Sequence, residues 1–121
     1  MARFMNKTLH SYLDYPVAIG LIAMPFLLSV GEGNPIALWL SVVTGIAALT
    51  LTVFTNHQFG LVKLIPYKLH LVVDFMVGVA FVAAPFVLGF AGLDAAYYWV
   101  LGVTVLIIVV LDNTTDTAVA T

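Results

Sequence analysis

The sequence contains no cysteine, and only 8% of its 121 residues are charged. The lack of cysteine excludes a disulfide framework, a thiol nucleophile and a thiolate metal site. The scarcity of charge excludes an ordinary soluble domain, in which about a quarter of the residues are charged. With only four lysines and arginines in total, the chain has no basic surface for nucleic acid, so no nucleic-acid partner is expected.

In place of charge, the chain has long apolar stretches. Hydrophobic residues make up 63% of the sequence, and the mean hydropathy is +1.13. Four stretches with almost no charge cover residues 12–30, 36–54, 71–90 and 96–111, the last being the shortest. Each is close to the ~20 residues that a helix needs to cross a ~30 Å hydrocarbon layer. The sequence therefore predicts an all-α protein of four transmembrane helices, with the lipid bilayer as its first partner.

The sequence contains an internal repeat, and each copy is predicted to form a two-helix unit. An offset of sixty residues aligns the two halves without a gap, and over residues 9–30 eight positions are identical. In the second copy these are Leu69, His70, Asp74, Val77, Ala83, Pro85, Phe86 and Leu88. The match continues through Asn34 with Asp94 and Trp39 with Trp99, so the repeat is a whole structural unit. We expect a first repeat over residues 1–60, a second over 61–111 and a polar C-terminal tail over 112–121.

The basic residues predict the orientation of the repeats. Arg3 and Lys7 precede the first apolar stretch, and Lys63 and Lys68 lie between the second and the third. By the positive-inside rule both termini and the middle connection face the cytoplasm. Because each repeat has an even number of helices, the two repeats enter the membrane in the same direction and are parallel. Asn34 and its counterpart Asp94 are placed to cap the second and fourth helices.

Two pairs of polar residues share one helical face in each repeat. His10 and Asp14 are four residues apart, as are His70 and Asp74. Ionisable groups are costly in lipid unless they are paired or hydrated, so parallel repeats are expected to bring the four together near the cytoplasmic end. We assign no catalytic residue and no metal, although the same four side chains could in principle form a two-His, two-Asp metal site.

Three interpretations of this polar cluster stay open. In the first, the aspartates accept hydrogen bonds from the histidines and lock the repeats together, since polar contacts between helices are common in membranes. In the second, the cluster relays protons or ions. In the third, which we weight least, His10 and His70 ligate a haem b from opposite sides. The sequence leaves undecided whether the His–Asp pairs form within a repeat or between repeats.

Two further groups of residues complete the set of candidate sites. Pro25 and Pro85 lie in the outer halves of the first and third helices, where a proline removes a backbone hydrogen bond and bends the axis. We expect the freed carbonyls to be satisfied by neighbouring helices or water. Rings with a polar edge follow each outer turn and are expected to anchor the helices at the lipid–water boundary: Trp39, Tyr97, Tyr98 and Trp99.

The order of these features resembles the SPW-repeat family of small prokaryotic integral membrane proteins. The shared features are His-x-x-x-Asp, a small residue, Pro-aromatic-x-Leu, a short turn and a Trp that opens the next helix. The tripeptide that names the family reads Met24-Pro25-Phe26 and Ala84-Pro85-Phe86 here, so only the proline matches. The resemblance covers about residues 9–111. It implies a multi-pass protein of the prokaryotic inner membrane without an established reaction, and it supplies no catalytic residues.

The function expected from the sequence is a structural or accessory role in the membrane, not an enzymatic one. We expect no cofactor and no large cavity, because four helices leave little room for a substrate path. Partner helices would supply further walls, in a homo-oligomer or as a subunit of a larger membrane complex. The alternatives are proton or ion translocation through the Asp/His cluster and, with less support, a haem b-binding membrane protein.

Overall fold

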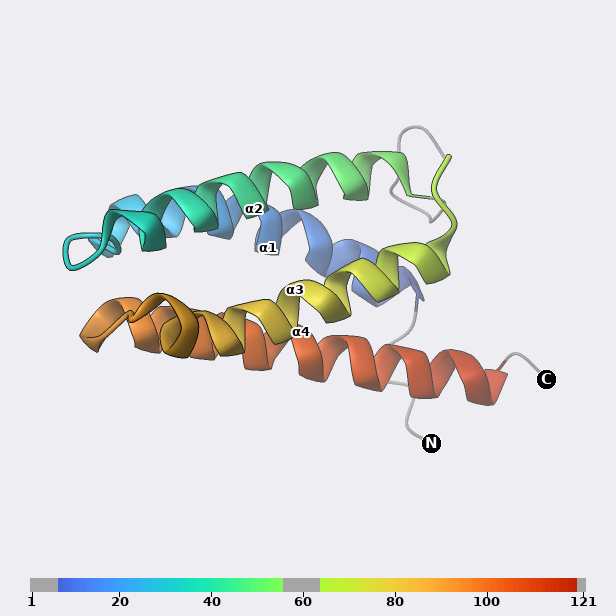
Figure 1. The fold of residues 1–121 in the computed structure, drawn as a ribbon. Coiled ribbons are helices and arrows are strands. Elements are labelled where there is room, and N and C mark those ends of the chain that lie inside the picture. The colour runs from blue at the N-terminus through green and yellow to red at the C-terminus, as the bar shows by residue number, and fades with distance from the viewer. Residues whose placement is uncertain (1–6, 56–63, 120–121) are drawn as a thin grey trace.

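The protein is a bundle of two helical hairpins (Figure 1). The computed structural model describes residues 7–55 and 64–119, with side chains described for 12–55 and 64–111. Its helices are α1 (Lys7–Leu27), α2 (Pro35–Phe54), α3 (Tyr67–Leu88) and α4 (Gly92–Val119). α1 and α3 run in the same direction, which confirms the all-α fold of two parallel two-helix repeats. We call the end with the α1–α2 and α3–α4 turns the turn end, and the end with Thr55 and Ile65 the connection end.

Three of the helices are long and apolar enough to cross a membrane, judged by length and composition. These spans are Pro35–Phe54, Tyr67–Leu88 and Gly92–Leu111, and a shorter apolar segment, Tyr12–Leu27, belongs to α1. The fourth span covers Gly92–Leu111 and is longer than the stretch 96–111 expected from the sequence. The difference arises because α4 begins at Gly92, before its aromatic residues, and its backbone stays helical past Leu111 to Val119.

The helix ends at the turn end follow the local sequence. Asn34 caps α2 by accepting a hydrogen bond from the Ile36 N–H at 3.0 Å, and Pro35 occupies the first helical position. Gly89 ends α3 in the left-handed conformation, with φ of 73°. Its repeat counterpart Ser29 adopts the same conformation, with φ of 61°, although it carries a side chain. The hydrogen bond from Ile36 confirms the prediction that Asn34 caps α2.

Small residues bring the two helices of each hairpin into close contact. A Cβ atom on Gly45 of α2 would lie 2.9 Å from the Ala18 carbonyl oxygen of α1. In the second repeat, a Cβ on Gly102 of α4 would lie 2.9 Å from the Gly78 carbonyl oxygen of α3. The backbones approach closely at these points because no side chain separates them. Most of the helix packing is therefore within each hairpin, and the two hairpins contact one another less extensively.

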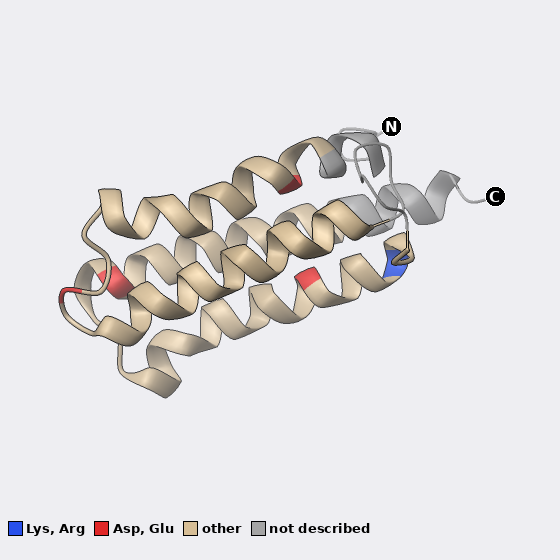
Figure 2. Ribbon diagram, turned by 90° about the horizontal axis from the view of Figure 1, so that it is seen from above, with Lys and Arg blue, Asp and Glu red and all other residues tan. Residues whose placement is uncertain are grey.

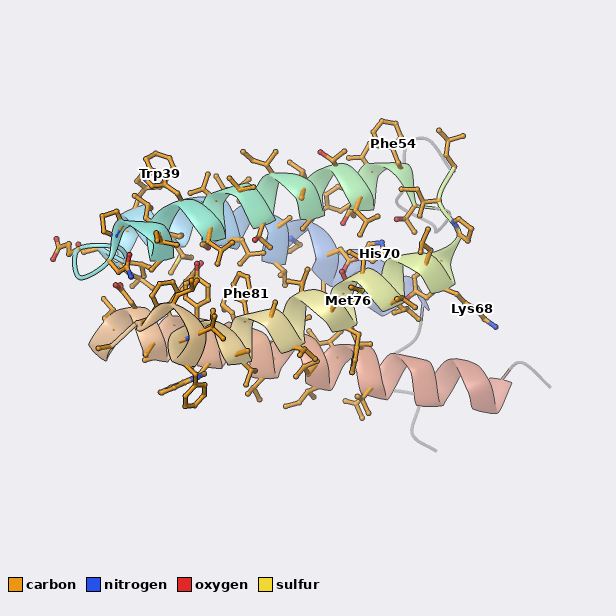
Figure 3. All side chains as sticks on the ribbon, in the orientation of Figure 1. Trp39, Phe54, Lys68, His70, Met76 and Phe81 are labelled. Carbon is orange, nitrogen blue, oxygen red and sulfur yellow. The ribbon has the colours of Figure 1, made fainter. Side chains whose placement is uncertain are left out.

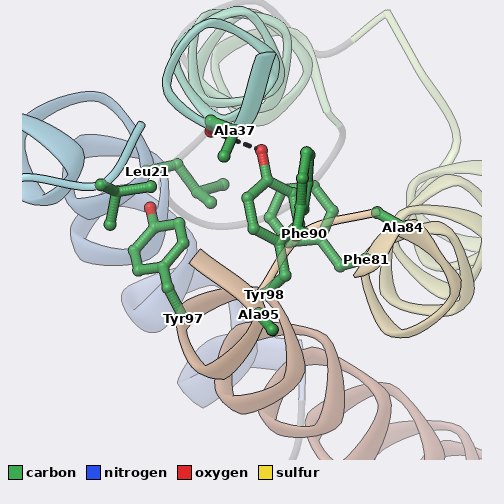
Figure 4. Close-up of a cluster of buried hydrophobic side chains, with 9 residues drawn as sticks. Leu21, Ala37, Phe81, Ala84, Phe90, Ala95, Tyr97 and Tyr98 are labelled. Atoms are coloured by element: carbon green, nitrogen blue, oxygen red, sulfur yellow. Dashed lines mark hydrogen bonds between the residues drawn. The ribbon is translucent and has the colours of Figure 1, made fainter. Parts of the chain in front are cut away.

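The apolar core between the hairpins lies at the turn end (Figure 4). Tyr98 of α4 is fully buried, with its ring centroid 4.5 Å from that of Phe81 and 4.8 Å from that of Phe90. Its hydroxyl donates a hydrogen bond to the Ala37 carbonyl oxygen of α2 at 2.6 Å. One aromatic side chain thus fills the core and joins the second repeat to the first.

Tyr97 and Tyr98 do not have the position expected of interfacial anchors. They are 6% and 0% exposed, because their rings point into the bundle and their hydroxyls bond to α2. The two tryptophans do lie on the outer surface, and Figure 3 shows Trp39 pointing away from the bundle. Each packs against the phenylalanine that follows the kink proline of its own repeat, with ring centroids 6.3 Å apart for Phe26–Trp39 and 5.6 Å for Phe86–Trp99.

Pro25 and Pro85, the two prolines predicted to kink their helices, are buried in the last turns of α1 and α3. Since Pro25 has no N–H, it leaves the Leu21 carbonyl oxygen without its usual helical donor. Ser41 of α2 donates its hydroxyl to that oxygen at 2.7 Å. Because the Ser41 proton is used there, the hydroxyl of Tyr97, 2.6 Å from Ser41 Oγ, is the donor in that second bond. The neighbouring helix α2 therefore satisfies the Leu21 carbonyl oxygen that Pro25 leaves free, as the sequence predicted.

Candidate functional site

The candidate site is a cluster of three ionisable side chains near the connection end. It joins α1 to α3 through Asp14, His70 and Asp74, and His70 is labelled in Figure 3. His70 is 1% exposed. Its Nε2 atom lies 3.1 Å from Asp74 Oδ2 and 3.3 Å from Asp14 Oδ2. The three ligand-type atoms all lie within 4.8 Å of one another.

The position of His70 answers the question that the sequence left undecided. His70 contacts Asp74, four residues along its own helix, and Asp14 of the other repeat. Pairing is therefore both within and between repeats. The side chains of Asp14 and Asp74 are less buried than that of His70, at 10% and 17% exposed. The side chain of His10, the fourth predicted member, lies outside the described residues.

The tautomer of His70 follows from its second ring nitrogen. Thr55, which ends α2, donates its hydroxyl proton to the Leu51 carbonyl oxygen at 2.5 Å. A carbonyl oxygen is only an acceptor, so the Thr55 hydroxyl has no proton left for His70. The 2.7 Å contact between Thr55 Oγ1 and His70 Nδ1 is therefore a bond that Nδ1–H donates. In the neutral imidazole, the lone pair is then on Nε2, the atom that faces the two carboxylates.

A cavity of about 360 Å³ adjoins the cluster, contrary to the expectation that four helices leave no large cavity. All four helices contribute to its wall, which is mostly aliphatic, with Val43, Leu51, Val73 and Val105 among its residues. Asp14, His70 and Asp74 form its main polar part. The cavity exists because the close helix packing is within each hairpin, so the space between the hairpins is filled at the turn end and less completely here.

A second polar contact joins the repeats at the turn end. The charged residues among the described side chains are few, as Figure 2 shows: Asp14, Glu32, Lys68, Asp74 and Asp94. Asp94 is 4% exposed and accepts hydrogen bonds from the backbone N–H groups of Gly31 at 2.8 Å and Asn34 at 3.1 Å. It lies in the first turn of α4, and its carboxylate binds the turn of the first repeat, so it does not act as the predicted cap before the fourth helix.

The apolar helices and the duplicated hairpin define a helical membrane protein with an internal repeat. The SPW repeat domain matches the chain over residues 7–112, and the protein belongs to this family. The match confirms the family that the sequence pattern indicated. Comparison with curated proteins and with solved structures finds no match.

Sequence reasoning missed two residues that complete these sites. Thr55 fixes the His70 ring and Ser41 satisfies the Leu21 carbonyl. At the sixty-residue offset the counterpart of Ser41 is Leu101, whereas that of Thr55 is Thr115. Comparison of the two repeats, which identified the aspartates and His70, cannot identify Ser41, because it occurs in one copy only. The match of Thr55 with Thr115 falls in the polar C-terminal segment, beyond the last apolar stretch. The remaining signal is their position: each is a small hydroxyl residue on α2, the helix that faces the partner hairpin at both ends.

Proposed function

We propose that this protein is a small structural or accessory membrane protein without a reaction of its own. In this role its two hairpins form one rigid unit that partner proteins or further copies recognise. The observation that supports the proposal is the contact of His70 with Asp14 of the other repeat and Asp74 of its own, at 3.3 and 3.1 Å. The polar groups contact one another directly, which favours a joint between hairpins over a hydrated path.

The contacts at the two ends of the bundle support the same role. Asp94 and Tyr98 of the second repeat bind the backbone of the first at the turn end, and the His70 cluster joins α1 to α3 near the other end. Polar contacts are directional, and aliphatic side chains in lipid have no hydrophobic driving force to associate. Two directional joints, far apart along the bundle, therefore fix the relative position of the hairpins.

A double-mutant cycle tests the joint between the repeats. Asp14→Ala and His70→Ala are made singly and together, and unfolding is measured in detergent with a metal chelator present. Each single variant should lose about 1–3 kcal/mol, because the partner stays buried without it. The coupling between the two should exceed the ~0.6 kcal/mol of an average membrane hydrogen bond. Additive losses, with no coupling, would count against the joint.

The partner and the orientation are parts of the same proposal. An open groove of about 480 Å³ lies between α1 and α4, and its lining includes the small residues Gly20 and Ala96. Small residues allow another helix to approach closely, which supports a homo-oligomer or a subunit of a larger complex. The positions of the basic residues support both termini and the middle connection facing the cytoplasm of a prokaryotic cell.

Proton or ion translocation is the second candidate, and the cavity beside the cluster favours it. Asp14, His70 and Asp74 line this space together with Thr44 and Thr52 of α2. Flux through proteoliposomes, compared between the wild type and a variant with both Asp14→Asn and Asp74→Asn, tests it. Translocation predicts a flux that the folded double variant loses. An equal flux in both samples would rule translocation out.

Haem b binding receives no support from the surroundings of His70. Its Nδ1 bonds to Thr55 and its Nε2 faces the two aspartates, so ligation of iron would require the loss of one of these contacts. Protein purified after haem supplementation should therefore lack a Soret band. A band that His70→Ala abolishes would reverse this conclusion.

A further inference from the structure

The cavity between the hairpins is lined mainly by short aliphatic side chains. Apart from the His70 ring, none of the described side chains in its wall is aromatic. At the turn end the space between the hairpins is filled by the rings of Phe81, Phe90 and Tyr98. The valine, leucine and alanine side chains of the cavity wall do not reach across the bundle in the same way, so a volume of about 360 Å³ stays open.

The dimensions of the cavity fit one hydrocarbon chain. Its wall extends from Leu13 to Leu21 on α1 and from Val43 to Thr52 on α2, about 12–14 Å along the helices at ~1.5 Å per residue. A methylene group in a liquid takes up about the same volume as a water molecule, roughly 30 Å³, so the cavity has room for about 12 carbon atoms. The volume also lies within the range of about 300–1,000 Å³ that is usual for small-molecule sites.

The wall suits hydrocarbon better than water. Its described polar side chains are Asp14, Thr44, Thr52, His70 and Asp74, and the other 12 described residues are aliphatic. A buried water needs about two to four polar partners, which the aliphatic part of the wall does not offer. An unfilled space would leave these side chains without dispersion contacts on one side. A hydrocarbon chain supplies those contacts and needs no polar partner.

The surrounding lipid can supply such a chain, because the cavity is not fully enclosed. Val43 belongs to its wall and is 61% exposed. We propose that the cavity binds one hydrocarbon chain, which belongs to a membrane lipid or to a free single-chain amphiphile. The methyl end of the chain lies against Leu21, which is 3% exposed and belongs to the turn-end core, and the polar end lies toward the His70 cluster. This binding site goes beyond the proposed structural role, and it does not depend on which further groups contact the cluster.

Photo-crosslinking of the full chain in bilayer nanodiscs tests the proposal. One arm uses a phosphatidylcholine with a diazirine near the methyl end of one acyl chain, and the other uses dodecanol with a diazirine at the same place. We expect labelling of Leu21, which a chain in the cavity reaches and lipid outside the bundle does not. The arm that labels Leu21 identifies the source of the chain. Labelling confined in both arms to exposed side chains such as Ile107 would overturn the proposal.

Two substitutions that fill the cavity make the test specific. Ala48→Phe adds a ring to the wall from α2 and should abolish most of the labelling of Leu21. Val105→Phe adds a ring from α4, and it keeps the proposal testable if Ala48→Phe fails to fold. Ala80→Phe is the matched control, since Ala80 is exposed on α3 and lies outside the wall, so its labelling should equal that of the wild type. Labelling of Leu21 that both filled variants retain would overturn the proposal.

A single introduced thiol separates hydrocarbon from water in the cavity. The chain contains no cysteine, so Val105→Cys provides the only thiol. If a hydrocarbon chain fills the space, this thiol should react with a charged, water-soluble thiol reagent as slowly as the thiol of Ile107→Cys, which lies on the outer surface of α4. A much faster reaction of Val105→Cys would show a hydrated cavity and overturn the proposal. The joint between the hairpins is tested separately by the double-mutant cycle of Asp14 and His70, so the two proposals can fail independently.

Discussion

Asp94 of α4 accepts a hydrogen bond from the Gly31 N–H at 2.8 Å, so a carboxylate of the second repeat closes the turn of the first. The same side chain accepts from the Asn34 N–H at 3.1 Å. We predict that Asp94→Ala lowers the free energy of unfolding by about 1.5–3 kcal/mol, because two N–H groups lose a charged acceptor. Thermal or denaturant unfolding in detergent measures the loss.

Glu32→Gln is the matched control for Asp94→Ala. Glu32 is an exposed acid in the turn that Asp94 binds. Its substitution should change stability by no more than about 0.5 kcal/mol. Equal effects of the two substitutions would mean that the turn responds to charge in general and not to the two hydrogen bonds.

Ser41 should matter more for stability than its size suggests. Ser41→Ala leaves both the Leu21 carbonyl oxygen and the Tyr97 hydroxyl buried without their shared partner. The expected loss is about 1–3 kcal/mol. Tyr97→Phe keeps the Ser41–Leu21 bond and should cost less, about 0.5–1.5 kcal/mol. If Tyr97→Phe proved as costly as Ser41→Ala, the Leu21 carbonyl oxygen that Pro25 leaves without a helical donor would not be the source of the effect.

Gly→Ala substitutions should lower the free energy of unfolding at glycines in close helix contacts and not at other glycines. Gly102→Ala places a Cβ 2.9 Å from the Gly78 carbonyl oxygen, and this backbone atom cannot move aside as a side chain could. We predict a loss of about 1–3 kcal/mol in the free energy of unfolding. Gly20→Ala is the control, since its Cβ would meet nothing closer than 3.8 Å and helix propensity favours alanine by about 1 kcal/mol. Similar outcomes for both would contradict the close packing of α3 and α4.

The difference between the two turns predicts a stabilising substitution. Ser29 has φ of 61° and is exposed, whereas Gly89 occupies the equivalent position with φ of 73°. Left-handed backbone costs a residue with a Cβ about 1–2 kcal/mol. Ser29→Gly should therefore raise the free energy of unfolding by about 0.5–1 kcal/mol, and Gly89→Ser should lower it. The melting temperatures of the two variants should move in opposite directions, and a shift of both in one direction would refute the reasoning.

Gly20→Leu tests self-association without disturbing the fold. The Gly20 position faces the α1–α4 groove, and its nearest contact leaves room for a side chain. If a second copy packs against this groove, the substitution should shift the oligomer to monomer in native mass spectrometry of detergent complexes. The melting temperature of Gly20→Ala serves as the reference for folding. An oligomer unchanged by Gly20→Leu would place the contact on another face.

Several features were predictable from the sequence because they depend on local chemistry. Apolar length predicted the helices, Asn34-Pro35 predicted the start of α2, and the repeat identified Asp14 and Pro25 as positions that both copies share. The matching positions on α3 are Asp74 and Pro85. A residue that recurs at the same place in both copies marks a position that the fold requires, whatever its neighbours are.

The errors came from contacts that the two repeats do not share. Tyr97 and Tyr98 are residue types common at the lipid–water boundary, but both are buried. Hydropathy alone cannot tell whether a ring points into the bundle or into lipid. Asp94 matches Asn34 in position, yet its carboxylate binds the other hairpin and not its own helix. In each case the partner lies about sixty residues away in the chain, where no local pattern indicates it.

Backbone preference and apolar length act within a few turns of helix, so the amino-acid order alone determined a duplicated hairpin of apolar helices. The way the hairpins meet was decided only by tertiary packing. That packing places Nε2 of His70 between acids from both repeats, uses Thr55 to fix the tautomer of the ring and leaves a cavity beside them. Such contacts depend on the relative rotation and depth of two rigid pairs of helices, which only the sum of all contacts between them determines.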